Sequence, residues 1–170
     1  MAAKELGVPI LPLYIHGFGQ ALPKHDFLLR HSSLYLEVGQ RFYVPLGDLA
    51  SFTRTIRHEY QAVYSRIRKE RETAEYFAPF VRSRYLYKGH DALAECRRVL
   101  CKATFIKVDK MTGNEALITD AGYGVYPLLV ALCHPEMRVI ATVLEENQYL
   151  TATRCIGLPS NLLYLYNNEW

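Results

Sequence analysis

The chain has 170 residues, of which 50% are hydrophobic and 22% are charged, so it can bury a core as one domain or as two small ones. Its formal net charge of +3 is modest and gives no indication of a nucleic-acid partner. No apolar run approaches the roughly 18 residues of a membrane span. No signal-peptide pattern occurs and no cysteines have C-x-x-C spacing. We therefore expect reduced thiols and a cytoplasmic location, with the inner face of the membrane as an alternative.

The first elements are a helix end and two strands. Residues 2–6, followed by Gly7, look like the last turn of a helix, which we expect to begin upstream. Residues 8–16 are apolar nearly throughout and predict a strand that is buried on both faces. Pro9 and Pro12 place this strand near an edge, because proline donates no backbone hydrogen bond. Residues 33–38 alternate as a half-buried strand does, with Leu34, Leu36 and Val38 on one side.

Residues 8–17 match the pattern V-P-[IV]-x-P-[VL]-x-[IV]-x-G, and residues 34–39 alternate before a glycine. This block resembles the end of a glycerolipid acyltransferase of the lysophosphatidate acyltransferase type. The resemblance implies that residues 1–47 are the C-terminal piece of such a domain. A buried strand that happens to carry two prolines is the alternative.

The catalytic motif of that family is missing. By resemblance, its chemistry uses a histidine base with an aspartate five positions later, which activates the acceptor hydroxyl. None of the histidines in this sequence has aspartate at that distance. His90 and Glu95 come closest, but they lie outside the block, at the start of a predicted helix. We therefore expect no acyl transfer to a lysophospholipid.

Residues 48–104 read as a helical connector. Asp48 is a candidate N-cap for a helix over residues 49–71, whose apolar residues keep helical spacing and whose other face is rich in arginine and lysine. Such a helix can lie on an anionic membrane surface, or its basic face is simply solvated. Thr73 caps a second predicted helix that runs to residue 84, and Asp91 caps a third that runs to about residue 103.

Residues 116–127 predict a strand, a glycine turn and the start of a helix. An apolar run ends in Asp120, Gly122 and Gly124 follow, and residues 128–132 are apolar with helical character. This order suits a nucleotide site, because the turn allows close backbone approach and the new helix presents unpaired N–H groups. An ordinary strand-to-helix turn is the alternative. Further on, residues 138–144 predict a strand, residues 145–156 a helix and residues 162–166 another strand.

The pattern of Asp120, Gly122 and Gly124 resembles the D-x-G-x-G motif of class I S-adenosylmethionine-dependent methyltransferases. The resemblance implies that residues 105–170 are the N-terminal half of such a domain, with a half Rossmann-like parallel sheet and S-adenosylmethionine as cofactor. Residues 85–89, Tyr-Leu-Tyr-Lys-Gly, follow the helical connector. The whole order resembles the junction in bacterial trifunctional proteins that join a lipid exporter, a lysophospholipid acyltransferase and a class I methyltransferase. The fold class expected is therefore α/β.

Two positions depart from the methyltransferase pattern. Tyr126 stands at the third glycine position, and Val143 stands where an acidic residue commonly binds the ribose hydroxyls. Glu145, or Glu146 beside it, is a candidate substitute; an acidic residue favouring a helix N-terminus is the alternative. Asn167, or Asn168 next to it, is a candidate adenine contact; a surface turn is the alternative.

Two classes of function follow. The chain is a fragment of a lipid-modifying fusion that is not catalytic by itself, or it contributes to methyl or acyl transfer in lipid or polyene biosynthesis when missing segments or a partner chain complete it. By resemblance, the first methyltransferase strand pairs with a fourth strand that this chain lacks. We therefore expect residues 116–121 to form an apolar edge that promotes self-association or pairing with the missing half.

Overall fold

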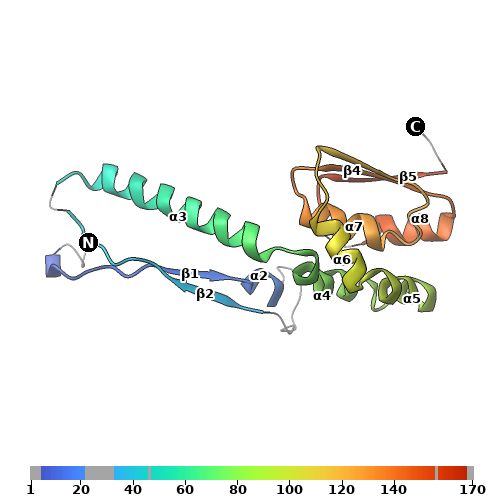
Figure 1. Ribbon diagram of the computed structural model, residues 1–170, viewed down its shortest axis with the longest axis horizontal. Helices are drawn as coiled ribbons and strands as arrows, with labels where there is room; N and C mark the ends of the chain where they lie inside the picture. Colours follow the sequence, from blue (N-terminus) through green and yellow to red (C-terminus); the bar gives the residue numbers. More distant parts are fainter. Residues whose placement is uncertain (1–4, 22–32, 46, 156, 168–170) are drawn as a thin grey trace. The chain divides into compact units, whose positions relative to one another are not determined.

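The structure is a computed structural model that describes residues 5–21, 33–45, 47–155 and 157–167 (Figure 1). It is a mixed α/β chain with a two-stranded sheet and a three-stranded sheet. The chain separates into two compact units, Met1–Arg71 and Glu72–Trp170. The predicted connector of residues 48–104 is thus divided between them. No helix within the described ranges combines the length and apolarity needed to cross a bilayer.

The first unit is built on a short antiparallel sheet. Strand β1, Leu13–His16, pairs with β2, Tyr35–Val38, and Leu13 lies opposite Val38 while Ile15 lies opposite Leu36. An isolated bridge joins Ile10 to Phe42. The strand predicted over residues 8–16 is therefore continuous only in its second half, where prolines no longer interrupt the backbone donors.

Helices α2 and α3 belong to the described part of the first unit. Helix α2, Phe18–Ala21, follows β1, and the long helix α3, Leu49–Arg71, follows β2. The carboxylate of Asp48 accepts the N–H groups of Ala50 at 2.9 Å and of Ser51 at 3.1 Å, which confirms the predicted N-cap.

Helix α3 covers only one face of the β1–β2 sheet. The rings of Tyr14 and Tyr60 lie 5.4 Å apart and those of His16 and Tyr64 lie 5.8 Å apart, and both β1 side chains are buried. Leu13 on the other face is 54% exposed. The prediction that the first strand is buried on both faces was wrong. On the apolar side of α3, Ile67 is fully buried and Tyr60 is 48% exposed, so the sheet covers this side only in part. Contact of the basic side with an anionic membrane surface remains a prediction.

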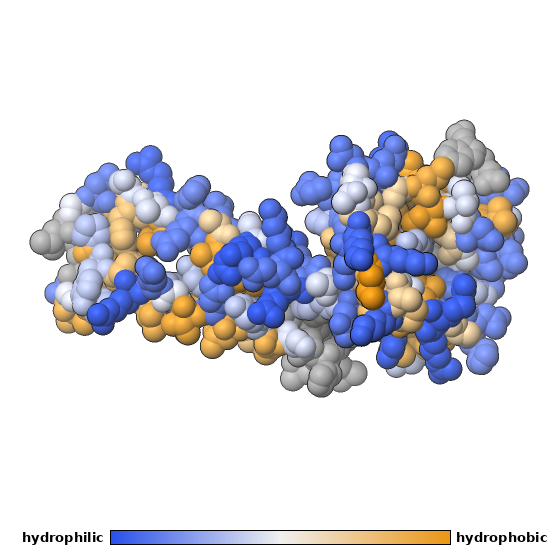
Figure 2. All heavy atoms as spheres, viewed as in Figure 1, coloured by the Kyte–Doolittle hydropathy of each residue, from blue (hydrophilic) through white to orange (hydrophobic). Residues whose placement is uncertain are grey.

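The second strand turns its predicted apolar side outward. Leu36 and Val38 are each 57% exposed, and Figure 2 shows hydrophobic side chains gathered along β1 and β2. On the opposite face, Glu37 forms an ion pair with Arg66 of α3. The guanidinium of Arg71 lies 4.3 Å from the centre of the Tyr35 ring on that same face. These long-range polar contacts determine which side of β2 meets the helix.

The second unit contains a parallel sheet in the order β3–β4–β5. The strands are β3, Glu115–Ile118, β4, Arg138–Val143, and β5, Leu162–Tyr166. Helix α7, Val125–Cys133, connects β3 to β4, and α8, Glu146–Thr153, connects β4 to β5. Both helices lie on the same side of the sheet (Figure 1). Three helices precede the sheet: α4, Ala74–Tyr85, α5, His90–Val99, and α6, Lys102–Asp109.

Helix α7 is the centre of this unit. Its first six residues except Tyr126 are buried, because the sheet packs on one side of it and α4, α5 and α6 pack around the rest. Thr73 caps α4 as predicted, and its hydroxyl oxygen accepts the N–H of Tyr76 at 3.3 Å. Asp109 at the end of α6 accepts the N–H of Ala74 at 2.7 Å. These two contacts fix the start of α4 and join it to the end of α6.

The far face of the three-stranded sheet is open within the described part of the chain. Leu117, Ile140 and Leu163 follow one another across the three strands, and Leu117 and Leu163 are 52% and 44% exposed. Strand β3 overlaps the predicted edge of residues 116–121 and occupies an edge of this described sheet. Self-association through that edge remains a prediction.

Candidate functional site

The turn that joins β3 to α7 has three residues in left-handed conformations. The φ angle is 51° at Asp120, 55° at Gly122 and 82° at Gly124. A side chain at Gly124 is also excluded by space, because a Cβ there would lie 2.6 Å from the Tyr164 hydroxyl oxygen. Asp120 adopts a conformation that few residues with side chains adopt, which is a common feature of binding sites.

Two buried tyrosines hold the turn from the core. The hydroxyl of Tyr85 donates to the carbonyl of Tyr123 at 3.0 Å, and the hydroxyl of Tyr164 donates to the carbonyl of Gly124 at 2.9 Å. Burial raises the pKa of both phenols well above the ordinary range, so both remain donors at physiological pH. The turn is thus fixed by hydrogen bonds that reach it from α4 and β5.

A carboxylate from α5 holds the turn from the opposite side. Glu95 accepts the N–H of Tyr123 at 2.9 Å and the N–H of Val125 at 3.4 Å. A Cβ at Gly122 would overlap a carboxylate oxygen of Glu95, so the glycine makes room for this side chain. Glu95 therefore caps the N-terminus of α7 from a different helix, where the helix dipole favours negative charge.

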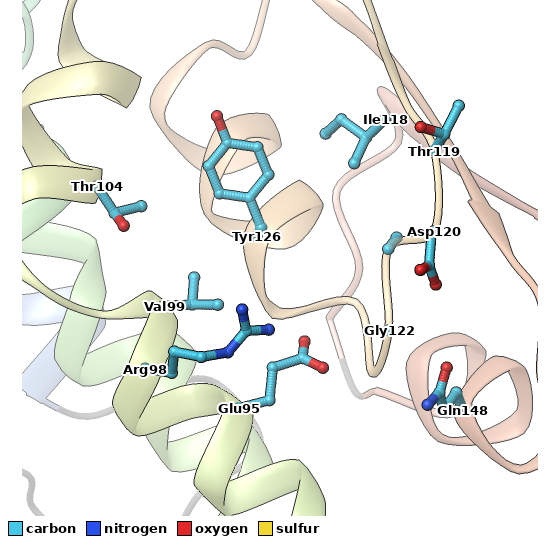
Figure 3. A pocket seen from close by; sticks show the side chains of 11 residues that line it. Glu95, Arg98, Val99, Thr104, Ile118, Thr119, Asp120, Gly122, Tyr126 and Gln148 are labelled. Atoms are coloured by element: carbon cyan, nitrogen blue, oxygen red, sulfur yellow. The ribbon is translucent and has the colours of Figure 1, made fainter.

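A cavity of about 520 Å³ opens beside this turn (Figure 3). Three charged side chains line it: Glu95, Arg98 and Asp120. Gln148 reaches it from α8, and Tyr126 lines it from α7. The complete lining is Glu95, Arg98, Val99, Thr104, Ile118, Thr119, Asp120, Ala121, Gly122, Tyr126 and Gln148.

The surroundings of the turn are negative. The pKa of Tyr123 is raised first by burial and then by the negative charges of Asp91, Glu145 and Glu95, in that order. Glu95 and Asp120 outnumber the single cation, Arg98, among the charged side chains of the cavity. A cationic group on a ligand is therefore favoured here over an anionic one.

The structure brings some of the predicted residues to this cavity and places others elsewhere. Asp120 and Gly122 line it, whereas Gly124 lies beneath the turn against Tyr164.

Glu145 is exposed at the N-cap position of α8, where its side chain makes no capping hydrogen bond. Asn167 is exposed after β5, with its backbone N–H bonded to the carbonyl of Val143 at 2.9 Å. Asn168 lies outside the described residues.

Val143 has no exposed surface. It packs in a cluster with Ala121, Ala141, Ala152 and Tyr164 at the end of β4. An acidic residue at this position would point into apolar surroundings in the present arrangement, so the apolar residue suits the local packing.

Sequence reasoning did not find the supporting residues of the site. Arg98 and Gln148 belong to no sequence motif that would have identified them. The spacing of Glu95 and Arg98, three positions apart, places both on one face of α5. Glu95 drew attention only as an imperfect partner of His90. The hydrogen bonds from Glu95 and Tyr164 span 28 and 40 residues, and no local pattern encodes them.

The cavity beside the turn offers polar and charged groups to a ligand. Its lining supplies carboxylates, one guanidinium, an amide and hydroxyl groups. No group of three or more potential metal ligands occurs among the described residues. Comparison of the chain with protein-family models, with curated proteins and with solved structures gave no match.

Proposed function

We propose that Glu72–Trp170 binds S-adenosylmethionine in the cavity beside Asp120, as the cofactor-binding part of a class I methyltransferase-like domain with a Rossmann-like half sheet. The observation that carries the proposal is the position of the cavity. It lies at the carboxyl end of β3, where Asp120 and Gly122 line it directly before α7. In open α/β sheets, ligands bind outside the carboxyl ends of the strands.

Other features of the cavity support this assignment. Its volume of about 520 Å³ falls within the usual range for small-molecule sites. The acidic side chains Glu95 and Asp120 suit a ligand that carries an ammonium and a sulfonium group. Gln148 and Thr119 add hydrogen-bonding groups for a polar ligand.

We propose further that the 170-residue chain does not by itself catalyse acyl or methyl transfer, as expected of a fragment of an acyltransferase–methyltransferase fusion. Its acyltransferase-like block has no histidine–aspartate pair with the required spacing. Val143 offers no carboxylate to a ribose. A missing charge-assisted hydrogen bond costs about 1.5–3 kcal/mol. The loss therefore weakens binding roughly ten- to a hundredfold.

The exposed sheet surface favours a second candidate function. The edge of β3 and the uncovered residues Leu117 and Leu163 would suit a further strand and helix, supplied by additional segments or by a partner chain. Completed in this way, the unit would transfer methyl groups in lipid or polyene biosynthesis. Acid–base groups for that reaction would then come from the completing segment.

Equilibrium titration with S-adenosylmethionine tests both statements. For the 170-residue chain, calorimetry is expected to give a dissociation constant above about 1 mM. A chain extended past Trp170 is expected to bind at least tenfold more tightly.

Asp120→Ala is expected to abolish binding in both chains. Glu136→Ala, which removes an exposed charge outside the cavity lining, is expected to leave binding unchanged. Absence of binding to both chains would contradict the assignment, and micromolar binding to the 170-residue chain would contradict an incomplete site.

A further inference from the structure

The carboxylate of Glu95 occupies the place where glycine-turn nucleotide sites hold a phosphate. Such sites bind phosphate through backbone N–H groups at the turn and at the start of the following helix. Here the N–H groups of Tyr123 and Val125 already donate to Glu95, at 2.9 and 3.4 Å. The surface of Gly122, across which a phosphate would approach, lies against the same carboxylate (Figure 3).

The start of α7 has few other donors to offer. Pro127 at its third position has no N–H group, and the N–H of Leu128 donates to the carbonyl of Gly124 at 3.2 Å. The N–H of Gly124 is used within the turn, where it donates to the carbonyl of Ala121 at 2.9 Å. An incoming phosphate would therefore have to displace Glu95 or stand against its negative charge.

We propose that Glu95 is the specificity-determining residue of this cavity, where it excludes phosphate-bearing nucleotides and receives the ammonium group of a phosphate-free ligand. Glu95 keeps a carboxylate in the cavity lining and also satisfies the backbone at the turn. Arg98, three residues later on the same helix, lies beside it (Figure 3). An amino-acid head group, with its ammonium and carboxylate close together, matches these two side chains.

The inference rests on the proposed function only in the choice of S-adenosylmethionine as the amino-acid ligand. The exclusion of phosphate depends on the contacts of Glu95 and holds for any occupant of the cavity. If Glu95 served only to cap α7, its removal would lower stability without creating a phosphate site. The gain of an anion site is therefore the readout that separates a specificity role from a purely structural one.

The experiment uses the ¹⁵N-labelled 170-residue chain, with inorganic pyrophosphate and S-adenosylmethionine as separate probes. The amide signals of Tyr123 and Val125 report on occupancy of the turn. In the wild-type chain, pyrophosphate is expected to leave both signals unchanged. In Glu95→Ala, it is expected to shift both signals along a saturable curve, because two N–H donors and the space of a carboxylate become free. The affinity for S-adenosylmethionine is expected to fall roughly tenfold in this variant, since one charged contact is lost.

Glu136→Ala is the matched control, because it changes net charge equally and Glu136 is exposed outside the cavity lining. If Glu95→Ala does not give a folded amide spectrum, Glu95→Gln replaces it, with a smaller gain expected because one acceptor oxygen remains. Equal pyrophosphate binding by the wild type and the Glu95 variant, or none by either, would overturn the inference. If S-adenosylmethionine binds neither the wild-type chain nor a chain extended past Trp170 while the variant gains pyrophosphate, the proposed function falls and the phosphate exclusion stands.

Discussion

In Met1–Arg71 a two-stranded sheet packs on one helix, whereas in Glu72–Trp170 a three-stranded sheet shares a continuous core with several helices. The buried hydrophobic side chains of the first unit are few among its described residues: Tyr14 and Ile67. In the second unit, the helix behind the sheet is buried along most of its length. Strands and helices therefore bury few side chains in the first unit, whereas in the second unit they enclose a large buried core.

The difference explains where the candidate site occurs. A binding turn needs its backbone fixed, and only a packed core supplies buried hydroxyl groups that reach its carbonyls, as Tyr85 and Tyr164 do. In the first unit, the sheet exposes apolar side chains such as Leu13 and Leu36 instead. Such a face indicates a contact surface rather than a cavity.

The largest effect is expected from Val143→Asp. Its side chain would carry a charge into a cluster with no exposed surface, which should lower the free energy of unfolding by about 3 kcal/mol or more at neutral pH. Burial raises the pKa of the new carboxyl in the folded state, so the loss grows as the pH rises above about 4. Urea unfolding at several pH values measures this.

Val143→Asn is the control for that experiment, because it has the same size and no charge. Its loss of stability should not depend on pH between about 4 and 7. A Val143→Asp chain as stable as the wild type would show that this side chain reaches solvent or a ligand. The compact core described for the second unit would then be wrong at the end of β4.

Within the second unit, Tyr164→Phe should have the next largest effect. The change removes one of the two donors to the buried carbonyl of Gly124 and leaves only the N–H of Leu128, at an expected cost of up to about 1.5 kcal/mol. Because burial raises the pKa of Tyr164 in the folded state, the wild-type chain should also lose stability as the pH rises above about 10, where the phenol ionises only after unfolding. Tyr164→Phe should lose less over the same range.

Tyr87→Phe serves as the comparison, because Tyr87 is 96% exposed. It should change the free energy of unfolding by less than about 0.5 kcal/mol. Equal effects of the two substitutions in urea unfolding would show that the Tyr164 hydroxyl does not support the turn.

The two helix caps allow a direct comparison of the units. Thr73→Ala removes the acceptor for the N–H of Tyr76, and Asp48→Ala removes the acceptor for the N–H groups of Ala50 and Ser51. Each should cost about 1 kcal/mol. Amide hydrogen exchange should show the loss in α4 for the first variant and in α3 for the second. Thr73→Ser keeps a hydroxyl acceptor, so amide hydrogen exchange in α4 should match that of the wild type. An equal loss of protection in Thr73→Ala and Thr73→Ser would argue against the cap.

Much of the local structure could be predicted, because it depends on local patterns. The alternation and apolar runs gave β2, β4 and β5, and the caps at Asp48 and Thr73 gave the starts of two helices. The third predicted helix, expected to reach residue 103, instead ends at Val99, and α6 begins at Lys102. No single sequence feature marked that break.

Long-range contacts determined the rest. The outward direction of Leu36 follows from the ion pair between Glu37 and Arg66, which lie 29 residues apart. At the site, the motif located Asp120 and Gly122, but the capping role of Glu95 depends on how α5 packs beside the turn. Such contacts have no signature in a single sequence.

The smallest effect is expected on the open face of the first unit. Leu36→Ser removes a side chain that is 57% exposed, so the free energy of unfolding should change by less than about 0.5 kcal/mol. Ile67→Ala in the same unit should cost about 2–5 kcal/mol, because Ile67 has no exposed surface. A comparably large loss for Leu36→Ser would show that another part of the protein covers this face.

The proposal that S-adenosylmethionine binds beside Asp120 underlies the other functional statements. Amide chemical-shift mapping of the labelled 170-residue chain, titrated with S-adenosylmethionine into the millimolar range, tests it most directly. Progressive shifts are expected at four residues that line the cavity, Asp120, Gly122, Tyr126 and Gln148, while the signals of α3 stay unchanged. Shifts confined to α3, or no shifts at the cavity when a chain extended past Trp170 is titrated in the same way, would contradict it.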